Sequence, residues 1–397
     1  MPHGWLFIVV HMRRIIVIAD DITGAAEIAG IATRYGLSVS MVVFNDVIGA
    51  DLRMNLSLAQ CYVIATDTRS MDVEGAVETT KKVVRWVKRK CGDETLPPHT
   101  LWYKKTDSAL RGHVVEELEA LMTETGHRKT LYLPANPSKG RTIQDGIYYV
   151  YGVPIDQTDF SFDPEFPAWT ANVVERLSFD SSSKIFFANA TTVGDIRLAV
   201  QQADKNTLLA GAADLFEAFL CKGESTCSPT NNDGRVTGGH VGSPLQDFYL
   251  GETGEGLLVV CGSTQSKPDA LGLPVVEIPR EVYDGEIDVN GWIDDYLETH
   301  SFPTSMALSF GNNRHRAGRE AALYMRDVMA KAAKRIIAVN HPKKLVIEGG
   351  STAFRLLESL GWNMLTITQE LSPGIVRMRT NNGMYVTMKP GSYPWKT

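Results

Sequence analysis

Apolar runs, several of them β-branched, recur along this chain of 397 residues, and polar residues follow many of them at once. Residues 15–18 are all Ile or Val, and further strand patterns lie at 61–65 and at 101–105, where the second ends in two lysines. Runs of this length are typical of strands that are buried on both faces of a parallel sheet. Helical spacing follows at 71–91 and at 113–125. The alternation of strands and helices predicts an α/β fold with a mainly parallel sheet.

Charged residues lie at the ends of three of these strands or shortly after them. They are Asp20 and Asp21 after the first run, Arg69 after the second, and Lys105, Asp107 and Arg111 after the third. Parallel strands of alternating βα units end at one edge of the sheet, where ligands bind in such folds, so we expect these side chains to cluster there. One of the adjacent aspartates can cap the next helix, but two carboxylates exceed what a cap needs, so at least one is expected to face a ligand, a substrate hydroxyl or Mg²⁺. A cluster with both signs of charge suits a substrate that is anionic at one end and rich in hydroxyls.

A polar, glycine-rich stretch at 222–255 interrupts the pattern. It is typical of a domain boundary, and the chain is long enough for two domains with separate cores. We expect an N-terminal domain over 1–225, a linker over 226–255 and a C-terminal domain over 256–397. The predicted fold is therefore two α/β domains with mainly parallel sheets and a ligand cleft between them.

Small-residue turns follow two predicted strands of the second half. Gly262 and Ser263 follow the strand at 257–261, and the segment 349–352 (Gly-Gly-Ser-Thr) follows the strand at 344–348. Backbone N–H groups in such turns can approach a phosphate at a helix N-terminus. The chain has neither GxxxxGK[ST] nor GxGxxG, so tight turns without a ligand remain the alternative. A helix is expected over 317–333.

Composition narrows the classes of function. A net charge of −6 argues against a general nucleic-acid-binding protein. No apolar stretch is long enough to span a bilayer. We expect residues 1–11 to be an extension before a natural start at Met12, so that deleting residues 2–11 leaves folding and activity intact. Five widely spaced cysteines without a CxxC pair predict neither a disulfide framework nor a zinc site, and favour a cytoplasmic location.

Several segments together resemble a known family. They are IADDITGAAEIAG, KKTDSALRG, GRTIQDGIYYVYGVPIDQTDF, CGSTQS, EGGSTAFRLLESLG, ELSPGI and MKPGS. In this order, from residue 18 to residue 392, they resemble the four-carbon acid sugar kinase family, which includes D-threonate, D-erythronate and 3-oxo-tetronate kinases. The resemblance implies an N-terminal acid-sugar domain and a C-terminal ATP domain, with the site in the cleft between them.

The resemblance also implies which residues form the site. On the substrate side they are Asp20, Asp21, Arg69, Lys105, Asp107 and Arg111. On the ATP side they are Ser263, Gly349, Gly350, Ser351, Thr352 and Gly391. The sequence departs from the family pattern at Ser351, where an acidic residue is common, and around Glu27, where a TGANDTG-type segment is common. The second departure indicates a distinct subgroup and leaves the substrate open.

The main hypothesis is phosphorylation of a hydroxyl of a four-carbon sugar acid by ATP with Mg²⁺. Arg69, Lys105 and Arg111 are expected to bind the substrate carboxylate or the γ-phosphate. One of the three aspartates would accept the hydroxyl proton or hold Mg²⁺ through water, and the sequence does not choose among them. The alternatives are an ATP-independent sugar-acid isomerase or lyase and a non-catalytic sugar-acid-binding protein. We expect no nucleic-acid or membrane partner, and a homodimer is a fair expectation.

Overall fold

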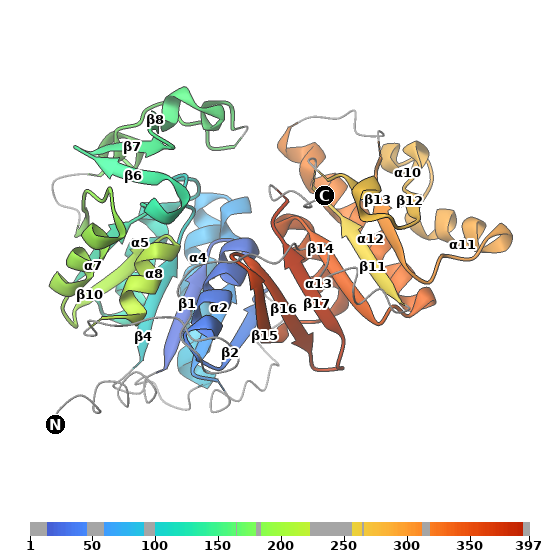
Figure 1. The fold of residues 1–397 in the computed structure, drawn as a ribbon, viewed down its shortest axis with the longest axis horizontal. Coiled ribbons are helices and arrows are strands. Elements are labelled where there is room, and N and C mark those ends of the chain that lie inside the picture. The colour runs from blue at the N-terminus through green and yellow to red at the C-terminus, as the bar shows by residue number, and fades with distance from the viewer. Residues whose placement is uncertain are drawn as a thin grey trace. The chain divides into compact units, whose positions relative to one another are not determined.

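The chain divides into two compact units, Met1–Thr237 (unit 1) and Gly238–Thr397 (unit 2). The computed structural model describes residues 14–45, 59–90, 100–163, 165–179, 184–222, 256–263, 266–311 and 318–391. The expected extension at 1–11 and the expected linker at 226–255 lie outside these residues. Figure 1 shows that each unit contains sheet strands with helices packed beside them.

The sheet of unit 1 is parallel throughout its described strand pairs. Its strands, in spatial order, are β2 (Val39–Val43), β3 (Cys61–Ala65), β1 (Ile15–Ala19), β4 (Leu101–Lys105), β10 (Thr207–Gly211), β5 (Lys129–Leu133) and β9 (Ile185–Phe187). Every residue of β1 and β3 is buried. The uninterrupted apolar run at 15–18 therefore forms a central strand, as its pattern predicts.

The helices of unit 1 follow the strands in βα order. They are α2 (Ile22–Arg34), α4 (Val73–Lys90), α5 (Val114–Thr125), α6 (Val173–Arg176), α7 (Val193–Gln202) and α8 (Ala213–Leu220). α4 packs against α5, and α2 packs against α8. A capping box formed by Thr192 and Asp195 begins α7.

A small antiparallel sheet lies in the segment that follows β5. It consists of β6 (Arg141–Gln144), β7 (Ile147–Val150) and β8 (Val153–Pro154). Four short 3₁₀ helices in unit 1 are η1 (Thr68–Ser70), η2 (Pro137–Lys139), η3 (Ile155–Gln157) and η4 (Asp159–Phe162). Two of them, η1 and η4, bring side chains to the charged cluster described below.

The sheet of unit 2 is parallel at one end and antiparallel at the other. Its order is β12 (Val275–Glu277), β13 (Met306–Ser309), β11 (Leu257–Cys261), β14 (Lys344–Glu348), β17 (Tyr385–Lys389), β16 (Ile375–Thr380) and β15 (Met364–Ser372). Two α/β units with mainly parallel sheets confirm the predicted fold class. The cleft between the domains stays a prediction.

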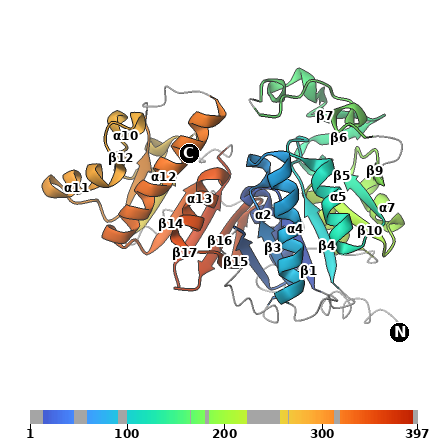
Figure 2. The ribbon, with the colours of Figure 1, turned by 180° about the vertical axis from the view of Figure 1, so that it is seen from behind.

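Four α-helices and one 3₁₀ helix of unit 2 have described bounds. They are α10 (Arg280–Asp284), α11 (Val289–Thr299), α12 (Arg319–Asn340), α13 (Gly350–Leu360) and the 3₁₀ helix η5 (Pro268–Leu271). α12 and α13 pack side by side, as Figure 2 shows from behind. The helix predicted over 317–333 is longer than expected, because its buried side continues beyond Ala333 to Ile336 before His341 ends it with a positive φ of 47°.

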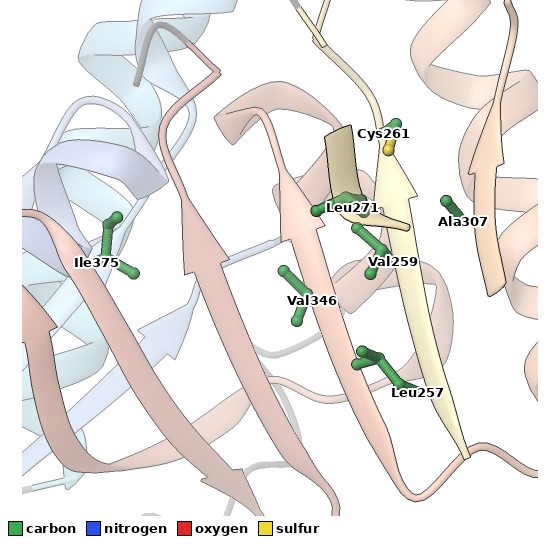
Figure 3. Packing of buried hydrophobic residues seen from close by; sticks show 7 residues of the cluster. All are labelled: Leu257, Val259, Cys261, Leu271, Ala307, Val346 and Ile375. Atoms are coloured by element: carbon green, nitrogen blue, oxygen red, sulfur yellow. The ribbon is translucent and has the colours of Figure 1, made fainter. Parts of the chain in front are cut away.

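One face of the unit 2 sheet carries a compact apolar cluster (Figure 3). Leu257, Val259 and Cys261 alternate along β11 and so share that face. The other members of the cluster are Leu271, Ala307, Val346 and Ile375. The cluster joins β11, β13, β14 and β16 to η5. Of these strands, β11 and β14 lead into the predicted phosphate turns.

Two further sequence expectations can be compared with the described residues. No helix among them is long and apolar enough to cross a membrane. Cys61 and Cys261 are buried and carry thiols rather than a disulfide bond. Cys221 is disulfide-bonded, which the spacing of the cysteines did not predict.

Candidate functional site

β1, β3 and β4 end together at one edge of the unit 1 sheet. Ala19 at the end of β1 pairs with Ala65 of β3 and with Lys105 of β4. The turns that follow these strands are therefore neighbours. Lys105 ends β4, and the turns contain the other five residues predicted for the substrate side, namely Asp20, Asp21, Arg69, Asp107 and Arg111.

Arg69 joins the three predicted carboxylates. Its guanidinium donates to both oxygens of Asp20 at 3.0, 3.1 and 3.2 Å. Its Nη1 donates to Asp21 Oδ2 at 3.3 Å and lies 3.6 Å from Asp107 Oδ1. The backbone N–H of Asp107 also donates to Asp20 Oδ2 at 3.2 Å. One cation thus connects turns from three strands.

Asp21 is the helix cap of the adjacent pair. Its side chain accepts from the backbone N–H of Gly24 at 2.8 Å and so begins α2. Its side chain is also the most accessible of the three carboxylates, at 21% exposed against 2% for Asp20 and 9% for Asp107. The cap and the most accessible carboxylate are therefore the same residue.

Asp107 is enclosed by its own turn and by Arg111. Arg111 donates to both carboxylate oxygens of Asp107, at 2.9 and 3.0 Å, and to Asp163 at 3.3 Å. The backbone N–H of Ala109 donates to Asp107 Oδ2 at 2.9 Å. The Phe160 ring of η4 lies 5.9 Å from the Arg111 guanidinium. The segment after β8 thus contributes Phe160 and Asp163, which the sequence analysis did not assign to the site.

The environments of Asp20 and Asp107 shift their acidities in opposite directions. Burial raises the pKa of Asp20 above its ordinary value, although Arg69 opposes this shift. Burial also disfavours the ionised form of Asp107, but Arg111 and Arg69 outweigh that effect and hold the pKa of this carboxyl well below its ordinary value. The surroundings thus favour the ionised form of Asp107 and disfavour that of Asp20.

Lys105 belongs to a second charged group beside the first. Its Nζ lies 3.5 Å from Glu27 Oε2 on α2 and donates to the Thr106 carbonyl at 2.9 Å. Lys139 of η2 donates to Glu27 Oε1. Burial opposes ionisation of Glu27, but the two lysines lower the pKa of its carboxyl overall. Glu27 therefore partly neutralises Lys105, which was predicted to bind the substrate. The sequence marked Glu27 only as a departure from the family pattern in the TGAAEIAG segment.

A buried polar group supports the turn that carries Arg69. Glu117 of α5 accepts from Thr68 Oγ1 at 2.7 Å and from Thr80 Oγ1 at 3.2 Å. Lys104 Nζ donates to the same carboxylate at 2.6 Å, and the Lys104 side chain is fully buried. This group ties η1 to β4 and α5. The sequence indicated Glu117 only as an acidic residue early in a helix.

Four of the six residues predicted for the ATP side meet in unit 2. The Cα of Gly391 lies against Ser263, so that a Cβ on Gly391 would stand 2.4 Å from Ser263 Oγ. A Cβ on Gly349 would lie 3.5 Å from the backbone nitrogen of Ser263. Thr352 is buried against Gly262, where a Cβ would meet Thr352 Oγ1 at 2.2 Å. These close approaches require glycine at positions 262 and 391.

The N-terminus of α13 faces this meeting of turns. Gly349 precedes the helix with a φ of 99°, and no side chain caps the helix there. Gly350 and Ser351, the remaining two predicted residues, are its first two residues, and Ser351 is exposed. Uncapped N–H groups and the positive end of the helix dipole favour an anion at this position. The small-residue cradle therefore fits a phosphate group.

A buried ion pair lies beneath the same turns. Lys389 Nζ donates to Glu348 Oε1 at 2.7 Å, and both side chains are at most 1% exposed. Ser266 Oγ donates to the other oxygen of this carboxylate. The sequence analysis missed this group. Glu348 at the end of a buried strand was a signal, but its partner Lys389 stands 41 residues away along the chain.

No metal-binding group stands out. Among the residues that the structure describes, no three His, Cys, Asp or Glu side chains are placed to hold a metal ion. The three aspartates around Arg69 are already bound to guanidinium groups.

Comparisons with known proteins match both halves of the chain to described domain families. A family model described as a sugar-binding N-terminal domain matches residues 15–218, and one described as a nucleotide-binding C-terminal domain matches residues 302–393. A 3-oxo-tetronate kinase of Methylobacterium radiotolerans is 24% identical over 95% of each chain. A D-threonate kinase of Salmonella typhimurium is 27% identical over 44% of this chain and 38% of that protein.

A solved structure shares the fold. A protein of Haemophilus influenzae from the family designated DUF1537 has a TM-score of 0.63 at 17% identity, covering 96% of this chain and 97% of that chain. The sugar-binding family model alone spans more than half of the sequence. The chain belongs to the four-carbon acid sugar kinase family, whose members are phosphotransferases that act on a hydroxyl group.

Proposed function

We propose that the protein transfers the γ-phosphoryl group of ATP to a hydroxyl of a four-carbon sugar acid. One observation carries this proposal. The unit matched by a sugar-binding model holds a carboxylate beside several cations, and the unit matched by a nucleotide-binding model holds an uncapped helix N-terminus in a glycine cradle. The two halves of a phosphoryl transfer, an acceptor site and a phosphate site, are thus represented in one chain.

The acceptor site is proposed to use its more accessible groups. Arg111 and Lys139 have side chains that are 30% and 32% exposed, whereas Lys105 is 5% exposed. We therefore assign the substrate carboxylate to Arg111 and Lys139. Arg69 and Lys105, which the sequence suggested as direct ligands, are proposed to organise the carboxylates around them.

Asp21 is our choice for the group that accepts the proton of the substrate hydroxyl. It is the most accessible carboxylate of the cluster, and its position is fixed by its bonds to Gly24 and Arg69. A positioned base of this kind contributes roughly 10²–10⁴-fold to a rate. Asp20 and Asp107 are proposed to hold Arg69 and Arg111 in place rather than to react.

The phosphate site is proposed to bind ATP through the backbone N–H groups at the start of α13, with Ser263 and Gly391 beside them. A bound Mg²⁺ would supply charge neutralisation on the phosphates. The hydroxyl of Ser351 is exposed at the position where the family commonly has an acidic residue, and it can donate to a phosphate oxygen.

The test combines nucleotide binding with turnover. Purified protein is titrated calorimetrically with ADP and Mg²⁺, and ADP release from ATP is then screened over four-carbon sugar acids. 3-Oxo-tetronate acids come first, because the 3-oxo-tetronate kinase matches nearly the whole chain and the D-threonate kinase less than half of it. Binding of ADP together with acid-dependent ADP release supports the proposal, and a lack of ADP binding contradicts it.

Ser351 favours one second candidate, a sugar-acid-binding protein without turnover. A hydroxyl in place of a carboxylate at the helix start removes a group that can orient Mg²⁺. This candidate predicts ADP and sugar-acid binding without ADP release from any acid. An ATP-independent isomerase or lyase is less well supported, since it gives the nucleotide-binding match no purpose.

A further inference from the structure

The three turns of the phosphate site leave the sheet of unit 2 at one level. Cys261 of β11 pairs with Glu348 of β14, and Glu348 pairs with Lys389 of β17, each as the last residue of its strand. Backbone bonds continue the row into the turns. The Gly262 N–H donates to the Glu348 carbonyl at 3.0 Å, and the Gly349 N–H donates to the Lys389 carbonyl at 3.0 Å.

The Glu348 side chain adds hydrogen bonds to those of the backbone. One of its oxygens accepts from Lys389, and the other accepts from Ser266, which lies at the end of the turn after β11. Lys389 also donates to the Pro390 carbonyl at 3.3 Å, next to Gly391. A single carboxylate therefore connects Ser266, the start of the turn at 349–352 and the turn at 390–391.

Such a buried pair needs a reason beyond the stability of the fold. Removing two charges from water costs several kcal/mol for each ion, and apolar residues of similar volume often replace a buried pair without loss of stability. β14 and β17 are already joined by backbone pairing through five residue pairs. The pair adds a fixed orientation of side chains. Because both oxygens of Glu348 accept hydrogen bonds, the carboxylate holds Lys389 and Ser266 in place.

We propose that Glu348 is a positioning residue that holds the three phosphate turns in the arrangement that receives the nucleotide. This inference rests on the proposed function. Glu348 acts through Ser266 and Lys389 and does not touch the nucleotide. The phosphates meet the N–H groups of α13, while Glu348 neutralises Lys389 and holds Ser266, which keeps Ser263 against Gly391.

The test removes one link and keeps the buried pair. Glu348→Gln removes the negative charge opposite Lys389 and is expected to unfold at lower temperature, so Ser266→Ala carries the test. In Ser266→Ala we expect ADP to bind about fivefold more weakly, the loss that one hydrogen bond of ordinary strength produces. The KM for ATP should rise by a similar factor, while the KM for the sugar acid stays unchanged. Ser266→Thr keeps the hydroxyl and should restore the affinity for ADP.

Ser359→Ala is the matched control, because Ser359 donates its hydroxyl to the Leu356 carbonyl at the opposite end of α13. It should bind ADP like the parent protein. Unchanged ADP affinity in Ser266→Ala overturns the positioning role of Glu348. An equal rise of the KM for both substrates, with a lower melting temperature, overturns it as well, because that result indicates a merely structural role. If the parent protein itself binds no ADP, the proposed function fails instead.

Discussion

At the scale of single residues, the two adjacent aspartates after β1 have different environments although they are neighbours in the chain. Asp20 is enclosed by Arg69 and by the N–H of Asp107. Asp21 keeps one side toward solvent while it caps α2. Carboxylates whose surroundings differ in this way commonly take different roles in a site. The structure thus separates an organising carboxylate from a candidate base.

Replacing Asp21 with Asn tests this separation. Asn caps a helix about as well as Asp, so the free energy of unfolding should change by less than about 1 kcal/mol. Turnover should fall at least about 100-fold, because the amide cannot accept the hydroxyl proton. Asp72→Asn is the matched control, since Asp72 accepts from the Gly75 N–H at 2.8 Å just before α4 and lies on an exposed turn. Turnover in Asp21→Asn equal to that of the control would rule out Asp21 as the base.

The lowered pKa of Asp107 predicts a dependence of stability on pH. As the pH falls, the unfolded chain binds a proton at this residue before the folded protein does, so the folded state loses an advantage that is complete above the ordinary pKa of 3.8. The difference in unfolding free energy between the parent protein and Asp107→Asn should therefore be constant from about pH 7 to about pH 5 and smaller near pH 3. Urea unfolding at each pH measures it.

Asp20→Asn provides the contrast for that experiment. Because the pKa of Asp20 is raised, its ionisation favours the unfolded chain as the pH rises. The stability of the parent protein relative to Asp20→Asn should therefore increase on acidification, opposite to the trend for Asp107. The same trend for both residues would show that the two carboxyls do not differ as their surroundings indicate.

At the scale of elements, the phosphate site depends on how closely turns approach each other. Gly262 leaves room for Thr352 at the start of α13, and Gly391 leaves room for Ser263. Each turn belongs to a different strand, so a shift of one turn changes the distance between backbone groups that would meet the same phosphate. The glycines are therefore required by packing between elements as much as by the local backbone.

Gly262→Ala is expected to disturb this packing. The added methyl would stand 2.2 Å from Thr352 Oγ1 and 2.5 Å from its Cβ, which forces the start of α13 to move. We expect a loss of about 1–3 kcal/mol in the free energy of unfolding and a larger loss in ADP binding. Chemical denaturation and calorimetry measure the two effects. Gly291→Ala in α11 is the control, because the added Cβ would lie 4.0 Å from the Ile287 side chain and alanine favours a helix. Normal ADP binding in Gly262→Ala would contradict the cradle.

Local pattern predicted the elements well and their partners poorly. The Ile and Val run at 15–18 contains enough information for a buried strand, because burial on both faces leaves only apolar side chains. Nothing local indicates that β10 lies between β4 and β5, since this order depends on long connections. The charged turns of unit 1 were visible because each follows its strand directly. Glu348 with Lys389, and Arg111 with Asp163, join residues 41 and 52 positions apart, which no periodicity reveals.

At the scale of the whole molecule, the two units carry different kinds of site on similar sheets. Both sites follow the carboxyl ends of parallel strands, as ligand sites in open α/β sheets generally do. Unit 1 presents charged side chains at that edge, whereas unit 2 presents glycines and backbone N–H groups. The division predicts that each ligand binds to a separate part of the chain.

Hydrogen exchange read by mass spectrometry tests this division. ADP with Mg²⁺ should slow exchange in peptides that cover 257–263 and 349–360, while the sugar acid should slow exchange around 15–34 and 101–114. Each ligand tightens the state that it binds, so protection is expected first in the elements that contact it. Protection of only the unit 1 peptides by ADP would contradict the assignment of the nucleotide to unit 2.

The sharing of Arg69 among three aspartates affects how this protein can change over evolution. A substitution at any of the four positions alters the charge balance of the other three, so single steps there are strongly coupled and seldom neutral. Lys139 and Asp163 lie at the border of the cluster. Lys139 forms an ion pair with Glu27, and Asp163 forms one with Arg111. We therefore expect substrate preference to change through substitutions at Lys139 and Asp163, while Arg69 and its three aspartates stay the same.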